Sequence, residues 1–187
     1  MKKFLKTAVV LASICAVSAV LLAAVNKVTA PAIEKYEQEV VMKALEDVAC
    51  GMEIGGRTEV SDNENISYYH VLSKSGQNCG YILGLKSNGY GGQLILVASY
   101  DEFGKLLAAK LVSDSETPGV GKKAENEGYM DKFIGKGSDV NPIPTAKSML
   151  TDVEASSVSG ASMTFNGVSR ALHAGCNFVK SLTGGDR

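Results

Sequence analysis

The sequence has no tryptophan, only two histidines and only four cysteines among its 187 residues. Four cysteines in this length are too sparse for a small scaffold held by disulfides. The 19 Lys and Arg residues nearly balance the 20 Asp and Glu residues, so the basic surplus typical of a nucleic-acid-binding protein is missing. With 45% hydrophobic residues and a net charge of −1, the chain is not a disordered polymer either. Its length allows one domain with a sizeable core together with additional elements.

The few histidines and cysteines also limit the chemistry that the side chains can perform. His70 lies in an expected strand and His173 on an expected helix, and neither has Cys, His or carboxylate neighbours at metal-ligand spacing. We therefore expect no metal site and no conventional catalytic residue. A disulfide between Cys50 and Cys79 is allowed in an oxidising compartment, although the cysteine count beyond the first segment is odd.

The mean charge hides a strong asymmetry, because residues 7–26 carry no charge at all. Lys2, Lys3 and Lys6 precede this run, and Lys27 follows it. Twenty helical residues at about 1.5 Å each span about 30 Å, the hydrocarbon thickness of a bilayer. The remainder, residues 28–187, is mildly acidic. We predict a transmembrane helix within residues 1–28.

A cleaved signal peptide is the alternative for this segment. Val28-Thr29-Ala30 fits a small-x-small cleavage site, but Pro31 follows it, and the apolar run is longer than the usual signal core. We therefore expect an uncleaved, single-pass anchor in the cell membrane. The lysine-rich end stays cytoplasmic by the positive-inside rule, which places the rest of the chain in the extracytoplasmic space.

Beyond the anchor, the pattern predicts an α+β domain with a mainly antiparallel sheet and flanking helices. A stalk helix is expected within residues 29–50 and the domain within 51–187. Residues 50–65 are glycine-rich and polar, and are expected to form a loop. Strands are expected at 66–72, 81–87, 93–100 and 105–113, and helices at 123–134 and 166–182.

Three glycine-bearing segments separate these elements and contain the candidate functional residues. They are Asn88-Gly89-Tyr90-Gly91-Gly92, Ser115-Glu116-Thr117-Pro118-Gly119-Val120-Gly121 and Ser159-Gly160-Ala161-Ser162-Met163-Thr164. Taken singly, each is an ordinary turn.

Their chemistry nevertheless suits a phosphorylated, flat ligand. Gly91 and Gly92 allow the backbone to approach it, and Tyr90 is available for stacking. A Pro-Gly pair favours a type II turn whose amides can point at a ligand. The third segment places hydroxyl groups next to a helix N-terminus, where free N–H groups favour a phosphate.

Together, in this order and behind one anchor, the segments resemble the FMN-binding G subunit of Rnf electron-transport complexes. The related FMN-binding C subunit of Na⁺-translocating NADH:quinone reductases is similar but longer. The family's Gly-Tyr-Gly-Gly stretch matches residues 89–92, and its Glu-Thr-Pro-Gly-Leu-Gly motif matches residues 116–121, with Val120 in place of leucine. Its flavinylation motif, Ser/Thr-Gly-Ala-Thr/Ser, matches residues 159–162.

The resemblance implies a covalent FMN, attached by a phosphoester to Ser162 through a separate flavin transferase. The family acceptor is usually threonine, and the aspartate that often precedes the motif is here Ser156. Thr164 is the alternative acceptor. The other residues implied in FMN binding are Ser159, Gly160, Ala161, Tyr90, Gly91, Gly92, Glu116, Thr117, Pro118 and Gly119.

The function implied is electron transfer within an ion-translocating ferredoxin:NAD⁺ oxidoreductase, an enzyme complex that couples electron flow to ion translocation. The expected partners are its other membrane subunits and its iron–sulfur subunits. Two alternatives remain: a stand-alone extracytoplasmic flavin carrier of another reductase pathway, and an unflavinylated structural or sensor component.

Overall fold

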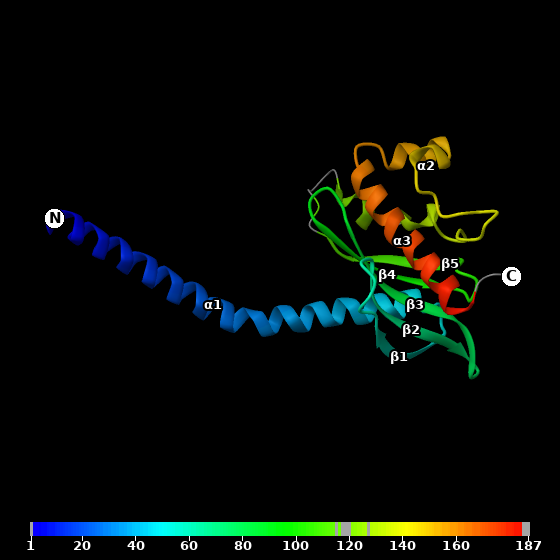
Figure 1. Ribbon diagram of the computed structural model, residues 1–187, viewed down its shortest axis with the longest axis horizontal. Coiled ribbons are helices and arrows are strands. Elements are labelled where there is room, and N and C mark those ends of the chain that lie inside the picture. The colour runs from blue at the N-terminus through cyan, green and yellow to red at the C-terminus, as the bar shows by residue number, and fades with distance from the viewer. Residues whose placement is uncertain (1, 115, 117–120, 127, 185–187) are drawn as a thin grey trace. The chain divides into compact units, whose positions relative to one another are not determined.

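The computed structural model describes residues 2–114, 116, 121–126 and 128–184 of the chain (Figure 1). The chain divides into two compact units, residues 1–40 and residues 41–187. The helices are α1 (Lys2–Val48), α2 (Asp152–Ser157) and α3 (Ser162–Leu182), with 3₁₀ helices η1 (Gly121–Glu125), η2 (Met130–Lys132) and η3 (Lys147–Met149). The strands are β1 (Glu53–Glu59), β2 (Ile66–Lys74), β3 (Gln77–Asn88), β4 (Gln93–Tyr100) and β5 (Leu106–Ser113). The predicted α+β class is confirmed.

The first unit contains α1 up to Val40, and α1 is long and apolar enough to cross a membrane by its length and composition. Its residues 4–39 are exposed. The helices expected on either side of Pro31 form one element, and Pro31 lies inside it. Because proline has no N–H group, the carbonyl of Lys27 lacks its usual helical donor.

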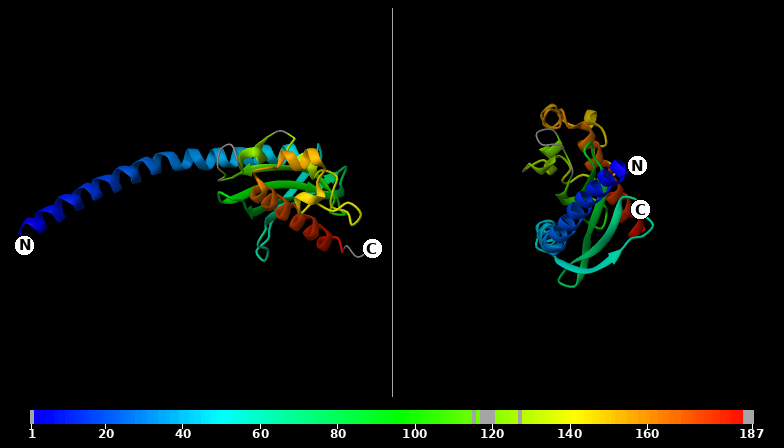
Figure 2. Two further views of the ribbon diagram at one scale, coloured as in Figure 1. Left: turned by 90° about the horizontal axis from the view of Figure 1, so that it is seen from above. Right: turned by 90° about the vertical axis from the view of Figure 1, so that its left-hand side faces the viewer.

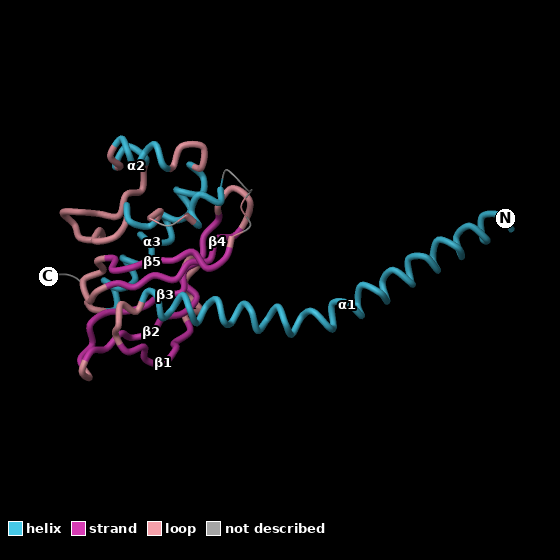
Figure 3. The backbone as a smooth tube through the Cα atoms, turned by 180° about the vertical axis from the view of Figure 1, so that it is seen from behind, coloured by secondary structure: helices cyan, strands magenta, loops and turns pink. Residues whose placement is uncertain are grey.

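The second unit is built on a five-stranded antiparallel sheet whose strands lie side by side in sequence order (Figure 3). The hairpin between β2 and β3 turns at Ser75 and Gly76, which both have positive φ (55° and 78°), as a two-residue turn of type I′ requires. Between β3 and β4 the register is continuous from Tyr81–Tyr100 to Asn88–Gln93. This pairing holds residues 89–92 at one end of the sheet.

Helices cover both faces of the sheet within this unit. On one face, α3 lies across the strands, as the views in Figures 1 and 2 show, and it buries its apolar stripe there. The buried side chains of this stripe are Phe165, Val168, Ala171, Leu172, Cys176 and Val179. On the opposite face, the last turn of α1 packs Ala44, Leu45 and Val48 against Leu72, Ile82 and Val97.

The structure differs from the sequence prediction in four elements. Residues 50–65 contain β1, an exposed strand, which the hydrophobic pattern missed because none of its residues is buried. The helix expected at 123–134 is instead η1 and η2, and the short helix α2 was not predicted. Helix α3 begins at Ser162, four residues earlier than expected.

All four cysteines, Cys15, Cys50, Cys79 and Cys176, are free. The disulfide that the sequence allowed between Cys50 and Cys79 is therefore not formed.

Candidate functional site

The loop between β3 and β4 presents the first glycine-bearing segment. Gly89 N–H donates to the carbonyl of Gly92 at 2.8 Å, which closes the turn. The side chain of Tyr90 at its tip is 71% exposed, so a phenol ring stands in solvent beside the loop backbone. A planar ligand can stack on this ring without displacing any core residue.

Glu116, in the second segment, holds this loop through hydrogen bonds to its backbone. Its side chain is buried, and its carboxylate accepts the N–H groups of Tyr90 at 2.8 Å and Gly91 at 3.3 Å. Its own backbone N–H donates to Asp114 Oδ1 at 2.8 Å. A Cβ atom on Gly89 would overlap the carboxylate, so glycine is needed for this close approach. The structure thus brings the first two segments together.

Thr117, Pro118 and Gly119, the other candidates of the second segment, lie outside the described residues. The same holds for Val120, so the proposed type II turn is an expectation from the sequence alone.

The third segment forms the start of α3. Ser162 is the first residue of the helix and its side chain is exposed, whereas the preceding Ala161 is buried. Gly160 has a φ of +81°, a conformation that L side chains rarely adopt, and it turns the chain into the helix. The first N–H groups of a helix have no intrahelical partner, so donors with a positive dipole lie close to the Ser162 hydroxyl.

Lys123 of η1 contacts this segment directly. Its Nζ donates to the carbonyl of Ser159 at 2.6 Å, which places a positive charge beside the turn that precedes Ser162. No sequence signal predicts this contact, because Lys123 is one of two adjacent lysines on a short polar stretch.

Thr164 differs from Ser162 in its surroundings. It is 1% exposed, and its Oγ1 has no hydrogen-bond partner among the described residues. Of these two residues, Ser162 is exposed to solvent and Thr164 is buried.

Helix α3 begins next to the loop of the first segment. A Cβ atom on Gly167 would lie 2.6 Å from the carbonyl oxygen of Asn88, and Arg170 Nη2 donates to the same oxygen at 3.3 Å. Asn88 immediately precedes the turn of the first segment, so this segment lies against α3 at Gly167 and Arg170, in the turns that follow Ser162.

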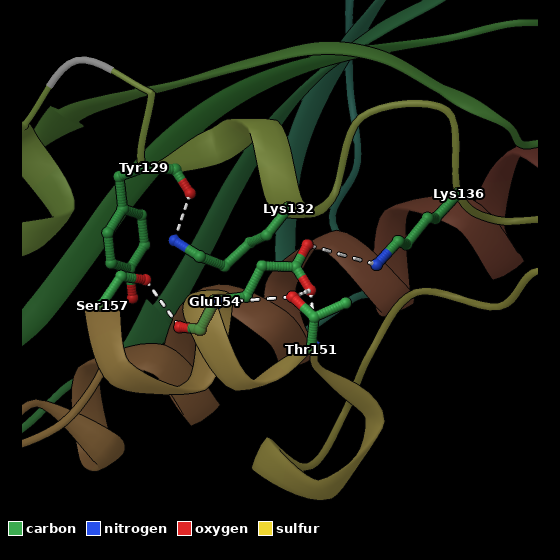
Figure 4. A network of polar contacts seen from close by, with 6 residues as sticks. All are labelled: Tyr129, Lys132, Lys136, Thr151, Glu154 and Ser157. Carbon is green, nitrogen blue, oxygen red and sulfur yellow. Dashed lines mark hydrogen bonds and ion pairs between the residues drawn. The ribbon is translucent and has the colours of Figure 1, made fainter.

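A polar network that the sequence did not reveal lies between η2 and α2 (Figure 4). Glu154 forms a capping box with Thr151 at the start of α2, and it pairs with Lys136 at 4.0 Å. The hydrogen bonds from Thr151 hold the pKa of Glu154 below its ordinary value. Lys132 Nζ donates to the carbonyl of Tyr129 at 2.5 Å. The pair of Lys136 and Glu154 joins the stretch that follows η2 to α2, the helix that precedes the third segment.

Comparison with known families first defines the class of protein. Residues 89–177 match the model of the FMN-binding domain, a range that includes the three glycine-bearing segments except Asn88. Residues 1–48 match the model of the RnfG N-terminal region, a range that coincides with α1.

Curated relatives then define the family. The chain is 25% identical over 175 residues (91% of this chain, 89% of the relative) to the G subunit of the proton-translocating ferredoxin:NAD(+) oxidoreductase complex of Clostridium ljungdahlii. It is 26% identical over 191 residues (98% of each) to the G subunit of the ion-translocating oxidoreductase complex of Methanosarcina acetivorans. It is 24% identical over 198 residues (97% and 94%) to the G subunit of the Na(+)-translocating ferredoxin:NAD(+) oxidoreductase complex of Acetobacterium woodii. The two family models and the three relatives agree, and the chain is similar along nearly its whole length to the G subunits of Rnf complexes.

Proposed function

We propose that this protein is the electron-transfer subunit of an ion-translocating ferredoxin:NAD⁺ oxidoreductase complex and carries FMN esterified on Ser162. The similarity to Rnf G subunits and the match to the FMN-binding domain support the coarser part of the proposal. One observation supports the finer part: Ser162 is exposed in the first turn of α3, the helix that packs against Asn88 of the first segment.

The residues around Ser162 fit a phosphate ester. The free N–H groups of the first turn and the Lys123 ammonium favour a negatively charged phosphate. Gly160 and Ala161 are small, so a flavin transferase can reach the hydroxyl without a clash. FMN, when bound, supplies redox chemistry that no side chain provides. The chain positions it: Ser162 holds the phosphate, and Glu116 keeps the loop of Tyr90 in place beside it.

Residues 1–28 are proposed to anchor the protein in the cell membrane, with the N-terminus in the cytoplasm. Residues 29–50 form the stalk and residues 51–187 the extracytoplasmic FMN domain. The partners proposed are the other membrane and iron–sulfur subunits of the complex, and a flavin transferase during maturation. A covalent link suits this location, because FMN lost outside the cell is not recovered from the cytoplasmic pool.

The test is in-gel flavin fluorescence of the full-length protein after production together with a flavin transferase and denaturation. Wild type and Ser162→Thr should fluoresce. Ser162→Ala should be dark, and its mass should be lower by one FMN minus water beyond the substitution itself. Thr164→Val is the matched control, since it removes a nearby buried hydroxyl at similar volume and should stay fluorescent. A wild type without fluorescence would refute the electron-carrier function in favour of a structural role. A fluorescent Ser162→Ala together with a Thr164→Val that lacks fluorescence would show that the ester is on Thr164 instead.

A further inference from the structure

A pocket of about 700 Å³ lies at the C-terminal end of α3, between the hairpin that joins β4 to β5 and the loop of residues 137–141 (Figure 1). Its lining includes Glu102 and Phe103 of the hairpin, Ser138 and Asp139 of the loop, and Lys180 and Thr183 of the helix end. Lys180 lies about 27 Å along α3 from Ser162, at about 1.5 Å per residue. None of the described candidates for FMN binding lines this pocket, so it is separate from the site described above.

The hairpin holds Phe103 in solvent on a well-ordered turn. Asp101 Oδ1 accepts the backbone N–H groups of Phe103 and Lys105, each at 2.9 Å. Gly104 has a φ of +81°, and a Cβ atom on it would lie 2.9 Å from the carbonyl oxygen of Cys176, so the turn packs directly on α3. The side chain of Phe103 is nevertheless 78% exposed. An aromatic ring that is already held in place loses little conformational entropy when a partner binds it.

The loop on the other side of the pocket is ordered in the same way. The N–H group of Gly137 donates to the carbonyl of Asn141 at 2.8 Å, which closes the loop. Asp139 pairs with Lys180 of α3 at 2.9 Å, and the next residue, Val140, is 97% exposed. Each of the two ordered loops therefore exposes an apolar side chain in or next to the lining of the pocket.

The charge that remains free in this pocket is negative. Glu102 forms no hydrogen bond or ion pair through its side chain with any residue that the structure describes. The side chain of Asp139 is 96% exposed, and Lys180 is its one described partner. Lys180 is also the one cation among the described lining residues, and it is already paired. The carbonyl groups at the end of α3 add the negative end of the helix dipole to the same place.

We propose that this pocket is a docking site for another subunit of the complex, which presents an arginine or lysine side chain to Phe103 and Glu102. The inference rests on that part of the proposed function which makes this chain a subunit of a complex. A cation can lie on the face of an aromatic ring while it pairs with a neighbouring carboxylate. Exposed aromatic residues of this kind are typical anchors of protein interfaces.

The charge of the pocket favours a protein partner over the membrane surface. Glu102 and the exposed Asp139 attract a basic segment of a protein, whereas an anionic lipid surface repels both carboxylates. The distance of the pocket from Ser162 also leaves the modified end of α3 free when the partner is bound.

The experiment replaces Phe103 with the photo-crosslinking amino acid benzoylphenylalanine in the full-length chain, in membranes of cells that produce the whole complex. Irradiation should join the chain to another subunit, and peptide mass spectrometry should place the crosslink in a segment that contains arginine or lysine. Adding Glu102→Lys should lower the crosslinked yield about tenfold, because like charges then face each other across the contact. Glu102→Gln, which keeps the size of the side chain, should lower it by less.

The matched control is Glu53→Lys, which reverses an exposed charge on β1 whose side chain has no partner among the described residues. It should leave the yield at Phe103 unchanged. High salt should lower the yield of the unsubstituted chain, because it screens an exposed charge contact.

Several outcomes would overturn the inference: no crosslinked product, a product with lipid, a product with a second copy of this chain, or a crosslink far from any arginine or lysine. Equal yields for Glu102→Lys and Glu53→Lys would also overturn it, because the charge of the pocket would then contribute nothing. In-gel flavin fluorescence of the same preparations tests the flavin separately. A flavin-containing chain without a crosslink overturns the docking site alone, and a crosslinked chain without flavin supports the docking site while it overturns the FMN ester.

Discussion

Among single residues, Glu116 shows how one side chain can organise a loop far away in sequence. Its carboxylate is buried, and two backbone N–H groups of the loop donate hydrogen bonds to it. Hydrogen bonds to a charged acceptor are stronger than neutral ones, and leaving a buried donor unpaired costs more than the bond itself contributes. Glu116 therefore adds two hydrogen bonds to the one between Gly89 and Gly92 that closes the turn.

Replacing Glu116 by alanine should lower the free energy of unfolding by about 2 kcal/mol, since it leaves the N–H groups of Tyr90 and Gly91 without their acceptor. Glu116→Gln retains one acceptor oxygen and should cost less. Urea unfolding of the unflavinylated full-length protein, followed by tyrosine fluorescence, measures both. Glu125→Ala is the control, because Glu125 forms only an exposed ion pair with Lys122 and should change stability by less than about 1 kcal/mol. Equal losses for Glu116→Ala and Glu125→Ala would contradict this role of Glu116.

The buried Lys132 should make stability depend on alkaline pH. Its pKa is about 8 in the folded protein and near the ordinary 10.5 in the unfolded chain. Between these values the unfolded state binds the proton and the native state does not, so the free energy of unfolding rises with pH, by at most about 1.4 kcal/mol per pH unit. Below pH 8 both states are charged and the burial penalty is complete. The wild type should thus gain stability relative to Lys132→Met between pH 8 and 10.5, and parallel pH profiles would contradict the prediction.

Among the secondary-structure elements, α3 is the helix on which the site depends. Its start carries Ser162, and its apolar stripe packs on the sheet, so the sheet determines where the modified hydroxyl lies. A close approach occurs at Gly167, against the carbonyl of Asn88 at the end of β3. A helix that moved away from this strand would also carry Ser162 away from the loop of Tyr90.

Gly167→Ala tests this contact, because two effects of opposite sign compete. Alanine favours a helix over glycine by about 1 kcal/mol. Its Cβ would lie 2.6 Å from a backbone oxygen that cannot rotate away, and such overpacking costs about 1–3 kcal/mol. We expect a net loss of unfolding free energy, together with a changed flavin spectrum. Asn166→Ala, at the exposed neighbouring position, should be neutral or slightly stabilising. A more stable Gly167→Ala would show that the helix has room to move.

For the whole molecule, the main division is between an apolar anchor and a mildly acidic domain. Three lysines precede the charge-free run and one follows it, and from this bias we predict that the short end lies in the cytoplasm. The two units of the structure divide the chain within α1, at residue 40.

Protease added to right-side-out membrane vesicles should therefore digest residues 51–187. In inverted vesicles the same residues should be protected until detergent is added, and an antibody against the C-terminal region detects the difference. Digestion only in inverted vesicles would reverse the proposed orientation. A mature protein that begins near Pro31 would show that the segment is a cleaved signal peptide instead.

Elements with periodic burial could be predicted from the sequence alone. Apolar spacing predicts strands β2 to β5 and most of α3, because each of these elements buries one face. The charge-free run is recognised because it contains no charged residue. Ser162 was a candidate because residues 159–162 resemble the flavinylation motif of the Rnf G subunits. β1 was missed because an exposed edge strand has no hydrophobic period, and η1 and η2 because 3₁₀ turns lack the helical one.

The meeting of these local features, by contrast, follows from the packing of the domain. The burial of Thr164 and the exposure of Ser162 differ although the two hydroxyls are two residues apart, because only one faces the sheet side of α3. Glu116 with Tyr90, Lys123 with Ser159, and Lys132 with the Tyr129 ring are likewise products of packing. Local sequence pattern reports which face of an element is apolar, whereas a contact between distant polar groups depends on how those faces are brought together, and that information lies in the folded core.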